Sequence, residues 1–352
     1  MTLTATHERD TRTDAPPART LAARRALGLV IILGALALLA LLSIGIGANP
    51  LSIPRVWHGL WHRGDGTEEA IIVWTMRGPR TVIGIMVGAA FGVAGALIQA
   101  LTRNPLADPG ILGVNAGAGF TVTLGVGVLG VSGIQGYIWF AFVGAALATV
   151  TVYMIGAMGR AAASSVTLVL AGVALAAVLN GISTFLTLID PDTFRSIRNW
   201  GLGSLARTSL SDATAVLVFI AVGLVLAVLL SGPLNSIAMG DDLAASLGTN
   251  VPWTRILSIV AITLLAGSGT ALTGGIAFVG LMVPHIVRWI VGPDQRWIIL
   301  YSALFAPVVL LSADILGRVL GGTGEIEAGI LTAVIGAPAL IVLVRRKKAS
   351  GL

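Results

Sequence analysis

Arg103-Asn104-Pro105-Leu106-Ala107-Asp108-Pro109-Gly110-Ile111-Leu112-Gly113 is a rigid polar turn between two long apolar segments, and this stretch decides the fold. Its two prolines restrict the backbone, and Asn104 can cap a turn. The side chain of Arg103 can reach a lipid phosphate. We therefore interpret Arg103, Asn104 and Pro105 as a structural turn at the membrane surface, between two segments that each cross the bilayer.

The composition agrees with a chain that lies mostly in lipid. Of its 352 residues, 56% are hydrophobic and 11% are charged, and the mean hydropathy is +0.93. An ordinary soluble globule does not have this composition. Because one helical crossing takes about 20 apolar residues, we expect an all-α polytopic membrane protein with ten transmembrane helices in residues 25–345. The expected spans are 26–47, 81–101, 110–131, 137–158, 165–189, 213–232, 253–272, 274–291, 297–316 and 328–344.

The distribution of charge predicts the topology. Residues 1–24 form a basic leader without apolar periodicity, which we expect to be disordered, and the apolar run after it is too long for a signal-peptide core. Ten crossings place this leader and the basic tail, residues 346–352, on the same side. If that side is the cytoplasm, 14 of the 22 Lys and Arg residues are cytoplasmic and 8 are outside, as the positive-inside rule requires. The pI of about 10.7 then indicates contact with anionic membrane lipid and argues against nucleic acid as a partner.

Two features argue that this chain neither hydrolyses ATP nor carries its own ion-driven engine. Its only lysines, Lys347 and Lys348, lie in the tail, so no glycine-rich loop can supply the lysine of a P-loop. Ion-driven carriers place carboxylates well inside the bilayer, whereas here Asp314 alone lies near the end of a span. We therefore expect no enzymatic activity, and energy supplied by a separate subunit.

Such a subunit needs a docking surface, and residues 233–250 are the candidate. They lie between the sixth and seventh expected spans, on the cytoplasmic side. Leu243, Ala244 and Leu247 have helical spacing, and glycines at 240 and 248 predict helix ends. We expect two short helices joined by a glycine turn. An ordinary interfacial loop is the alternative.

Several motifs in this order resemble the FecCD family of permeases in binding-protein-dependent ABC importers, which carry ferric siderophores, haem or cobalamin. The resemblance covers about residues 30–345. Its motifs are Arg77-Gly78-Pro79-Arg80, Gly95-Ala96-Leu97-Ile98-Gln99, the turn at 103–109, Met239-Gly240-Asp241, Ser246-Leu247-Gly248, Gly274-Gly275-Ile276-Ala277-Phe278-Val279-Gly280-Leu281, Pro284-His285-Ile286-Val287-Arg288, Ala313-Asp314 with Arg318, Gly329-Ile330-Leu331-Thr332 and Gly336-Ala337-Pro338.

The resemblance implies an assembly in the cytoplasmic membrane of a bacterium. The permease would pair with itself or a paralogue, on two ABC ATPase subunits and beneath one extracytoplasmic substrate-binding protein. ATP and Mg²⁺ would bind to the ATPases, and this chain would bind no cofactor. Residues 233–250 would be coupling helices, with the coupling residues Met239, Gly240, Asp241, Ala244, Leu247 and Gly248.

Three arginines match positions where similar permeases meet acidic residues of the binding protein. Arg77, Arg80 and Arg318 are all extracytoplasmic in the predicted topology, and a planar guanidinium suits bidentate contact with a carboxylate. Contact with lipid phosphates is the alternative. The docking role of Arg318 is the least secure, because Glu325-Ile326-Glu327 replaces the family's usual Glu-Leu-Pro.

A polar stripe in the fifth span is the candidate lining of a translocation path. Asn180, Ser183, Thr184 and Thr187 are spaced to share one helix face, although such residues also form hydrogen bonds between helices. At the start of that span, Ser164 and Ser165 match positions of cytoplasmic gate hydroxyls in similar permeases.

Three histidines receive structural interpretations. Pro284 and His285 belong to the family pattern and are expected to organise a turn. His58 and His62 could form half a metal site, but without a third ligand we prefer an interfacial helix, with Trp57 and Trp61 at the headgroup level. No metal site is therefore predicted.

The sequence thus predicts the permease subunit of an ABC importer for a ferric siderophore. Cobalamin and haem are the alternative cargoes within the family. A self-contained ion-coupled secondary carrier and a membrane receptor or scaffold are the alternatives from other classes.

Overall fold

The computed structural model describes residues 18–131, 133–157, 165–321 and 324–345, and every regular element in these ranges is a helix. Seven helical stretches are long and apolar enough to cross a membrane. One of them joins three elements, α3 (Glu68–Ile71), the π-helix η1 (Ile72–Arg77) and α4 (Gly78–Thr102). The other six are α1 (Ala18–Gly45), α6 (Ile134–Ala157), α7 (Ser165–Ile189), α9 (Leu210–Ala238), α11 (Val251–Thr273) and α13 (Gln295–Leu320).

Three shorter apolar helices bring the described set to the ten that the sequence predicts. They are α5 (Val114–Gly127), α12 (Val279–Val291) and α14 (Ala328–Arg345). The third and eighth expected spans are longer than the helices α5 and α12 that form there. Residues 110–113 precede α5 and residues 274–278 precede α12, although both stretches are apolar. Of the leader that was expected to be disordered, residues 18–24 already belong to α1, and residues 1–17 lie outside the described residues. The basic tail lies outside the described residues.

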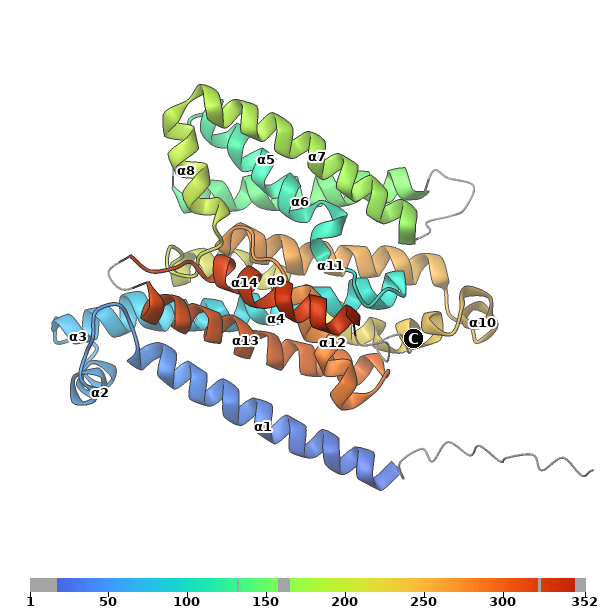
Figure 1. The fold of residues 1–352 in the computed structure, drawn as a ribbon, viewed down its shortest axis with the longest axis horizontal. Helices are drawn as coiled ribbons and strands as arrows, with labels where there is room; N and C mark the ends of the chain where they lie inside the picture. The colour runs from blue at the N-terminus through green and yellow to red at the C-terminus, as the bar shows by residue number, and fades with distance from the viewer. Residues whose placement is uncertain (1–17, 132, 158–164, 322–323, 346–352) are drawn as a thin grey trace, which may run out of the picture.

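The α4 helix lies at the centre of the bundle, packed against α9, α11, α12 and α13 (Figure 1). Its contact with α13 is close because glycines face that helix: a methyl group at Gly88 would lie 2.6 Å from Pro307 Cα. Small residues at such seams let backbones approach and increase van der Waals contact, which drives helix association in lipid. On one flank of this core, α5, α6, α7 and the short α8 (Pro191–Gly201) form a group that packs against α11 through α5 and α6, while α1 lies along the opposite edge.

A non-helical segment, residues 274–278, separates α11 from α12. Gly274 and Phe278 both have positive φ values, 76° and 68°. Other backbone lies close against the segment, since a methyl group at Gly203 would lie 2.6 Å from Gly275 O. Beside it, Ser204 N donates to Thr273 O at 2.8 Å, and Gly329 N donates to Gly203 O at 2.8 Å. Irregular backbone at membrane depth is tolerated where protein surrounds it, and these contacts supply that protection.

The two ends of the bundle carry different short helices (Figure 1). One end, called the α10 end, holds α10 (Asp241–Ser246), the 103–113 turn with its 3₁₀ helix η2 (Pro109–Leu112), the start of α1 and the end of α14. The opposite end, called the α2 end, holds α2 (Ile53–Trp61), α3 and α8. Both described ends of the chain therefore lie on one side, as an even number of crossings requires.

Candidate functional site

The polar turn at the α10 end has the internal bonds of a rigid structure. Arg103 ends α4 in the left-handed conformation, with φ 48°. Asn104 Oδ1 accepts from Leu106 N at 2.9 Å, and Asp108 Oδ1 accepts from Gly110 N at 2.8 Å to cap η2. From inside α4, Gln99 Nε2 donates to Ala107 O of the turn at 3.3 Å and to Leu281 O of α12 at 2.9 Å. The turn is thereby fixed to both α4 and α12.

The side chain of Arg103 has a protein partner where the sequence suggested a lipid phosphate. It forms an ion pair with Asp241, the first residue of α10, and Asp241 is also paired with Arg255 of α11 at 2.6 Å. One carboxylate therefore links the turn, α10 and α11. A displacement of α10 would be passed directly to the ends of α4 and α11.

The α10 helix is a six-residue element between two glycines with positive φ, Gly240 at 114° and Gly248 at 84°. The expected pair of short helices is corrected, because α9 continues through Pro233 to Ala238 and only α10 stands alone. Two carboxylates in its first turn, Asp241 and Asp242, suit the positive end of the helix dipole.

One side of α10 is anchored and the other is free. Ala244 is fully buried against Ile237 and Val251. The free side exposes Leu243 (47% exposed) and Leu247 (59%), and Met239, at the end of α9 just before α10, is 58% exposed. Of the predicted coupling residues, Ala244 is therefore an anchor, the two glycines set the bends, and Met239 and Leu247 are exposed. Sequence reasoning missed Leu243 as a surface residue, although its i, i+4 spacing with Leu247 was visible.

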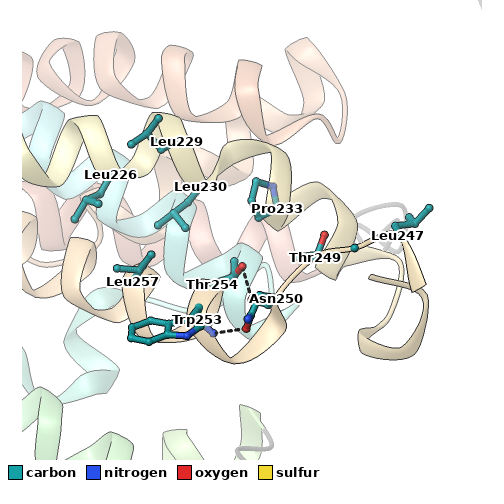
Figure 2. Close-up of a pocket in the computed structure, with 11 residues that line it drawn as sticks. Leu226, Leu229, Leu230, Pro233, Leu247, Thr249, Asn250, Trp253, Thr254 and Leu257 are labelled. Carbon is teal, nitrogen blue, oxygen red and sulfur yellow. Dashed lines mark hydrogen bonds between the residues drawn. The ribbon is translucent and has the colours of Figure 1, made fainter. Parts of the chain in front are cut away.

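An open apolar groove of about 450 Å³ lies beside this surface, between α9 and α11 (Figure 2). Leu230, Pro233 and Leu257 line its wall, and Leu247 lies at its α10 edge. At the start of α11, the Asn250 side chain accepts from Trp253 N at 3.2 Å and caps the helix. Part of the exposed side of α10 is therefore continuous with an unfilled groove.

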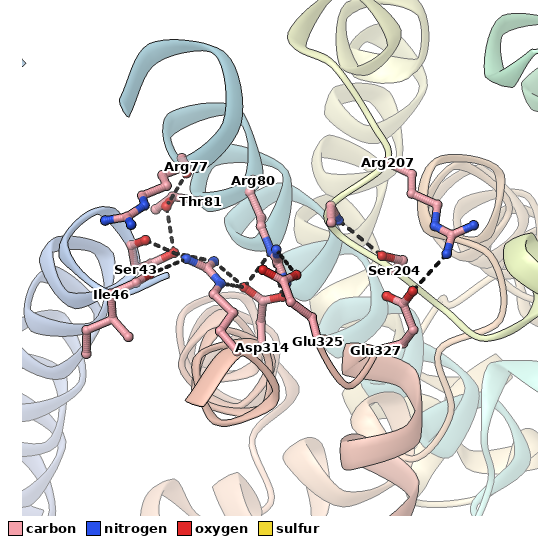
Figure 3. A network of polar contacts seen from close by, with 12 residues as sticks. Ser43, Ile46, Arg77, Arg80, Thr81, Ser204, Arg207, Asp314, Glu325 and Glu327 are labelled. Carbon is pink, nitrogen blue, oxygen red and sulfur yellow. Dashed lines mark hydrogen bonds and ion pairs between the residues drawn. The ribbon is translucent and has the colours of Figure 1, made fainter. Parts of the chain in front are cut away.

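At the α2 end, a buried ion-pair network surrounds Asp314 of α13 (Figure 3). Asp314 has no exposed surface and accepts from Arg80 Nη2 at 2.7 Å and from Arg318 Nε at 3.0 Å. Arg80 also pairs with Glu325 at 2.6 Å. Three arginines and two carboxylates meet here, with Arg77 as the third arginine, so the cluster carries one surplus positive charge.

The guanidinium groups of Arg77 and Arg318 donate hydrogen bonds to backbone carbonyls at the end of α1 and just after it. Arg77 donates to Gly45 O and Asn49 O, each at 2.6 Å, and Arg318 donates to Ser43 O at 2.6 Å and Ile46 O at 2.9 Å. Carbonyl oxygens at the end of a helix lack intrahelical donors, and these arginines supply them.

These contacts correct the expectation that Arg77, Arg80 and Arg318 present a docking patch. The structure brings the three arginines together at one end of the bundle, but they are only 4%, 8% and 3% exposed and donate hydrogen bonds within the chain. Exposed charge at this end lies elsewhere. Arg207 pairs with Glu327 at 3.0 Å, and Arg55 pairs with Glu68 at 3.2 Å and Glu69 at 3.1 Å.

The predicted path residues lie on α7, a helix at the surface of the chain. Asn180 and Thr184 are exposed, and Ser183 and Thr187 are half-buried. The three hydroxyls donate to carbonyls of their own helix, including Thr184 Oγ1 to Asn180 O at 2.8 Å. The hydrogen bonds described for these hydroxyls therefore do not join α7 to a neighbour. Of the predicted gate residues, Ser164 lies outside the described residues, and Ser165 begins α7 with its side chain undescribed.

Pro284 and His285 lie inside α12, one turn after its start, rather than in a turn of their own. His285 is buried, and its ring packs edge-on against Trp289 with centroids 5.3 Å apart. These surroundings support a packing role for His285.

Comparison with known proteins gives one consistent result. The sequence matches the FecCD transport family over residues 35–346. It is 46% identical over 324 residues to the ferric enterobactin transport system permease protein FepD of Escherichia coli (strain K12), covering 92% of this chain and 94% of that protein. It is 32% identical over 336 residues to the hemin transport system permease protein HmuU of Yersinia pestis, covering 92% and 96% of the two chains. A solved structure described as an inward-facing metal-chelate type ABC transporter is similar with a TM-score of 0.79 and 27% identity, over 92% of this chain and 99% of that one.

Proposed function

The chain belongs to the FecCD transport family of ABC importer permeases, and we propose that it moves a ferric siderophore across the bacterial cytoplasmic membrane. The observation that carries this cargo is the 46% identity, along nearly the whole chain, to a ferric enterobactin permease. An ion-coupled secondary carrier and a receptor or scaffold are set aside, because membership of an importer permease family gives the chain a transport role powered by a separate ATPase.

The α10 end is the proposed contact surface for the ABC ATPase, which places both termini in the cytoplasm. Its exposed apolar side chains on a short helix fit a cleft in another protein. The Asp241 carboxylate then transmits movement of α10 to α4 through Arg103 and to α11 through Arg255. Since both helices belong to the packed core, the shift passes as a rigid displacement, which alternating access requires.

The remaining partners follow from the family. The proposed assembly contains two ATPase subunits that hold ATP and Mg²⁺, a second permease that is this chain or a paralogue, and an extracytoplasmic substrate-binding protein. This chain binds no cofactor. The binding protein would meet the α2 end at exposed groups such as Arg207 and Arg55.

The test is uptake of ⁵⁵Fe-labelled siderophores in a host with this gene deleted and then restored on a plasmid. The panel contains ferric catecholate, hydroxamate and citrate complexes, beside labelled cobalamin and haem. Loss of one iron chelate, restored by the plasmid, would support the proposal and name the cargo. Wild-type uptake of every iron chelate in the deletion strain would reject it.

Haem is the second candidate cargo, because the hemin relative covers nearly the same part of the chain. Selective loss of haem uptake in the same panel would replace the siderophore with haem. Selective loss of cobalamin would instead place the chain in the corrinoid branch. Either result leaves the ATPase contact at α10 unchanged.

A further inference from the structure

A group of metal-binding side chains lies at the α2 end, apart from the ion-pair network. His58, His62 and Asp65 each offer one ligand atom, and these three atoms all lie within 4.8 Å of one another. From the sequence, the two histidines had no recognised third ligand, which argued against a metal site. In the structure Asp65 supplies that ligand. All three side chains are exposed, so an ion can reach them from water.

Local structure explains how these three residues meet. The two histidines are four residues apart at the end of α2, which stacks their rings with centroids 4.2 Å apart and an interplanar angle of 11°. The chain then turns back, with Asp65 N donating to His62 O at 3.4 Å. Trp57 and Trp61 are exposed on the same short helix, with ring centroids 5.7 Å apart. The interfacial role expected for these tryptophans is therefore compatible with a metal site beside them.

One of the two histidines has its Nδ1 turned toward a hydrogen-bond acceptor, since His62 Nδ1 lies 3.0 Å from His58 O. A carbonyl partner of this kind fixes the tautomer of a metal-binding histidine and leaves Nε2 of His62 as the ligand. His58 Nδ1 lies 3.5 Å from Glu69 Oε1 and makes no hydrogen bond. Glu69 is itself held by Arg55 at 3.1 Å. The surroundings of His62 thus resemble the outer shell of a metal site.

We propose that His58, His62 and Asp65 bind a divalent transition-metal ion of the Zn²⁺ type, with water as the fourth ligand. Two imidazoles and one carboxylate suit Zn²⁺, Ni²⁺ or Cu²⁺ and are a poor set for Mg²⁺ or Ca²⁺, which need more oxygen ligands. Tetrahedral bonds of about 2.0–2.2 Å require ligand atoms about 3.3–3.6 Å apart. The in-plane lone pairs of two stacked, nearly parallel rings do not converge on one point, so binding requires the exposed histidine side chains to rotate out of their stack.

A bound ion would join the end of α2 to the turn that follows it. Glu69 and Arg55 connect the same region to α3, which continues through η1 to Arg77 and α4. Metal binding would therefore stabilise the extracytoplasmic segment between α1 and α4. This inference does not depend on the identity of the transported cargo.

The test is titration of the purified full-length chain, without a histidine tag, with ZnCl₂ in detergent by isothermal calorimetry. All proteins carry His7→Ala to remove a competing ligand outside the described residues. We expect one ion per chain, a tenfold or greater loss of affinity in His62→Ala and in Asp65→Asn, and no change in Glu68→Gln. Glu68 is the matched control, since it is an exposed acid of the same segment that lies outside the group.

Co²⁺ provides a second measurement on the parent chain alone, in case a variant does not fold. A tetrahedral site gives an intense visible absorption band that an octahedral aquo ion lacks, and ZnCl₂ should displace it. The proposal would be overturned if binding were not saturable, if the ligand variants bound as tightly as Glu68→Gln, or if Co²⁺ gave only the spectrum of the aquo ion.

Discussion

Asp314 is a single buried carboxylate that serves two buried arginines. Arg80 reaches it from the start of α4, and Arg318 lies one turn further along α13. Because Arg318 also donates to Ser43 O and Ile46 O, the network joins α1, α4 and α13. Loss of the carboxylate would leave buried positive charges without a counter-charge, which costs more than the net contribution of the pairs themselves.

We therefore expect Asp314→Asn to lower the free energy of unfolding by about 3–5 kcal/mol. Thermal unfolding of the purified chain in detergent measures this loss. The matched control is Glu325→Gln, which removes a partly exposed partner of the same Arg80 and should cost about 1 kcal/mol or less. Similar losses in the two variants would show that the network does not depend on Asp314.

Sequence reasoning placed Arg80, Arg318 and Asp314 near the same membrane surface but did not predict that they pair. Arg80 and Asp314 are 234 positions apart, and the end of a span can face lipid, another protein or the interior of its own bundle. One signal was available. A lone carboxylate near the end of a span is costly without a partner, and arginines expected at the same end were the natural candidates.

At the scale of elements, α10 combines a fixed face with a free apolar face. The sequence predicted this segment and its two glycine boundaries, because glycine tolerates the positive φ that both bends require. It did not predict that Pro233 lies inside α9. Proline usually ends a helix, but within a bundle neighbouring helices can compensate for the hydrogen bond that it removes.

Leu247→Glu should abolish uptake and the stimulation of ATPase activity by the binding protein, while the chain remains folded. Leu247 is exposed, so the substitution creates no buried charge and should change stability by no more than about 0.5 kcal/mol. Ala245→Glu is the control, because it adds the same charge to an exposed residue of α10 on a different face from Leu243 and Leu247. Normal uptake by Leu247→Glu, or equal loss in the control, would contradict the coupling role of this face.

For the whole molecule, burial is uneven in a way that one chain does not explain. In the most apolar part of each span, 78% of residues are buried for the span containing α4, whereas the value for α7 is 17%. Hydropathy alone could not have shown this difference, since both segments are long and apolar. The exposed face of α7 includes Asn180, whose side-chain amide would be unfavourable against lipid tails, beside Thr184, whose hydroxyl is bonded within the helix. A second permease that encloses a water-filled path beside α7 would remove this cost.

This arrangement predicts the reactivity of engineered cysteines, which the cysteine-free sequence allows to be read without background. In the assembled transporter, Thr184→Cys should react with a membrane-impermeant thiosulfonate, because the path brings water to α7. Val228→Cys on α9 is the control, since Val228 is 64% exposed on a helix that offers lipid an apolar surface. Its thiol should stay unreactive, because a charged reagent does not enter lipid and a thiol in hydrocarbon does not ionise. If neither cysteine reacted with the reagent, α7 would face lipid. Its hydroxyls would then serve only to form hydrogen bonds with carbonyl groups of their own helix.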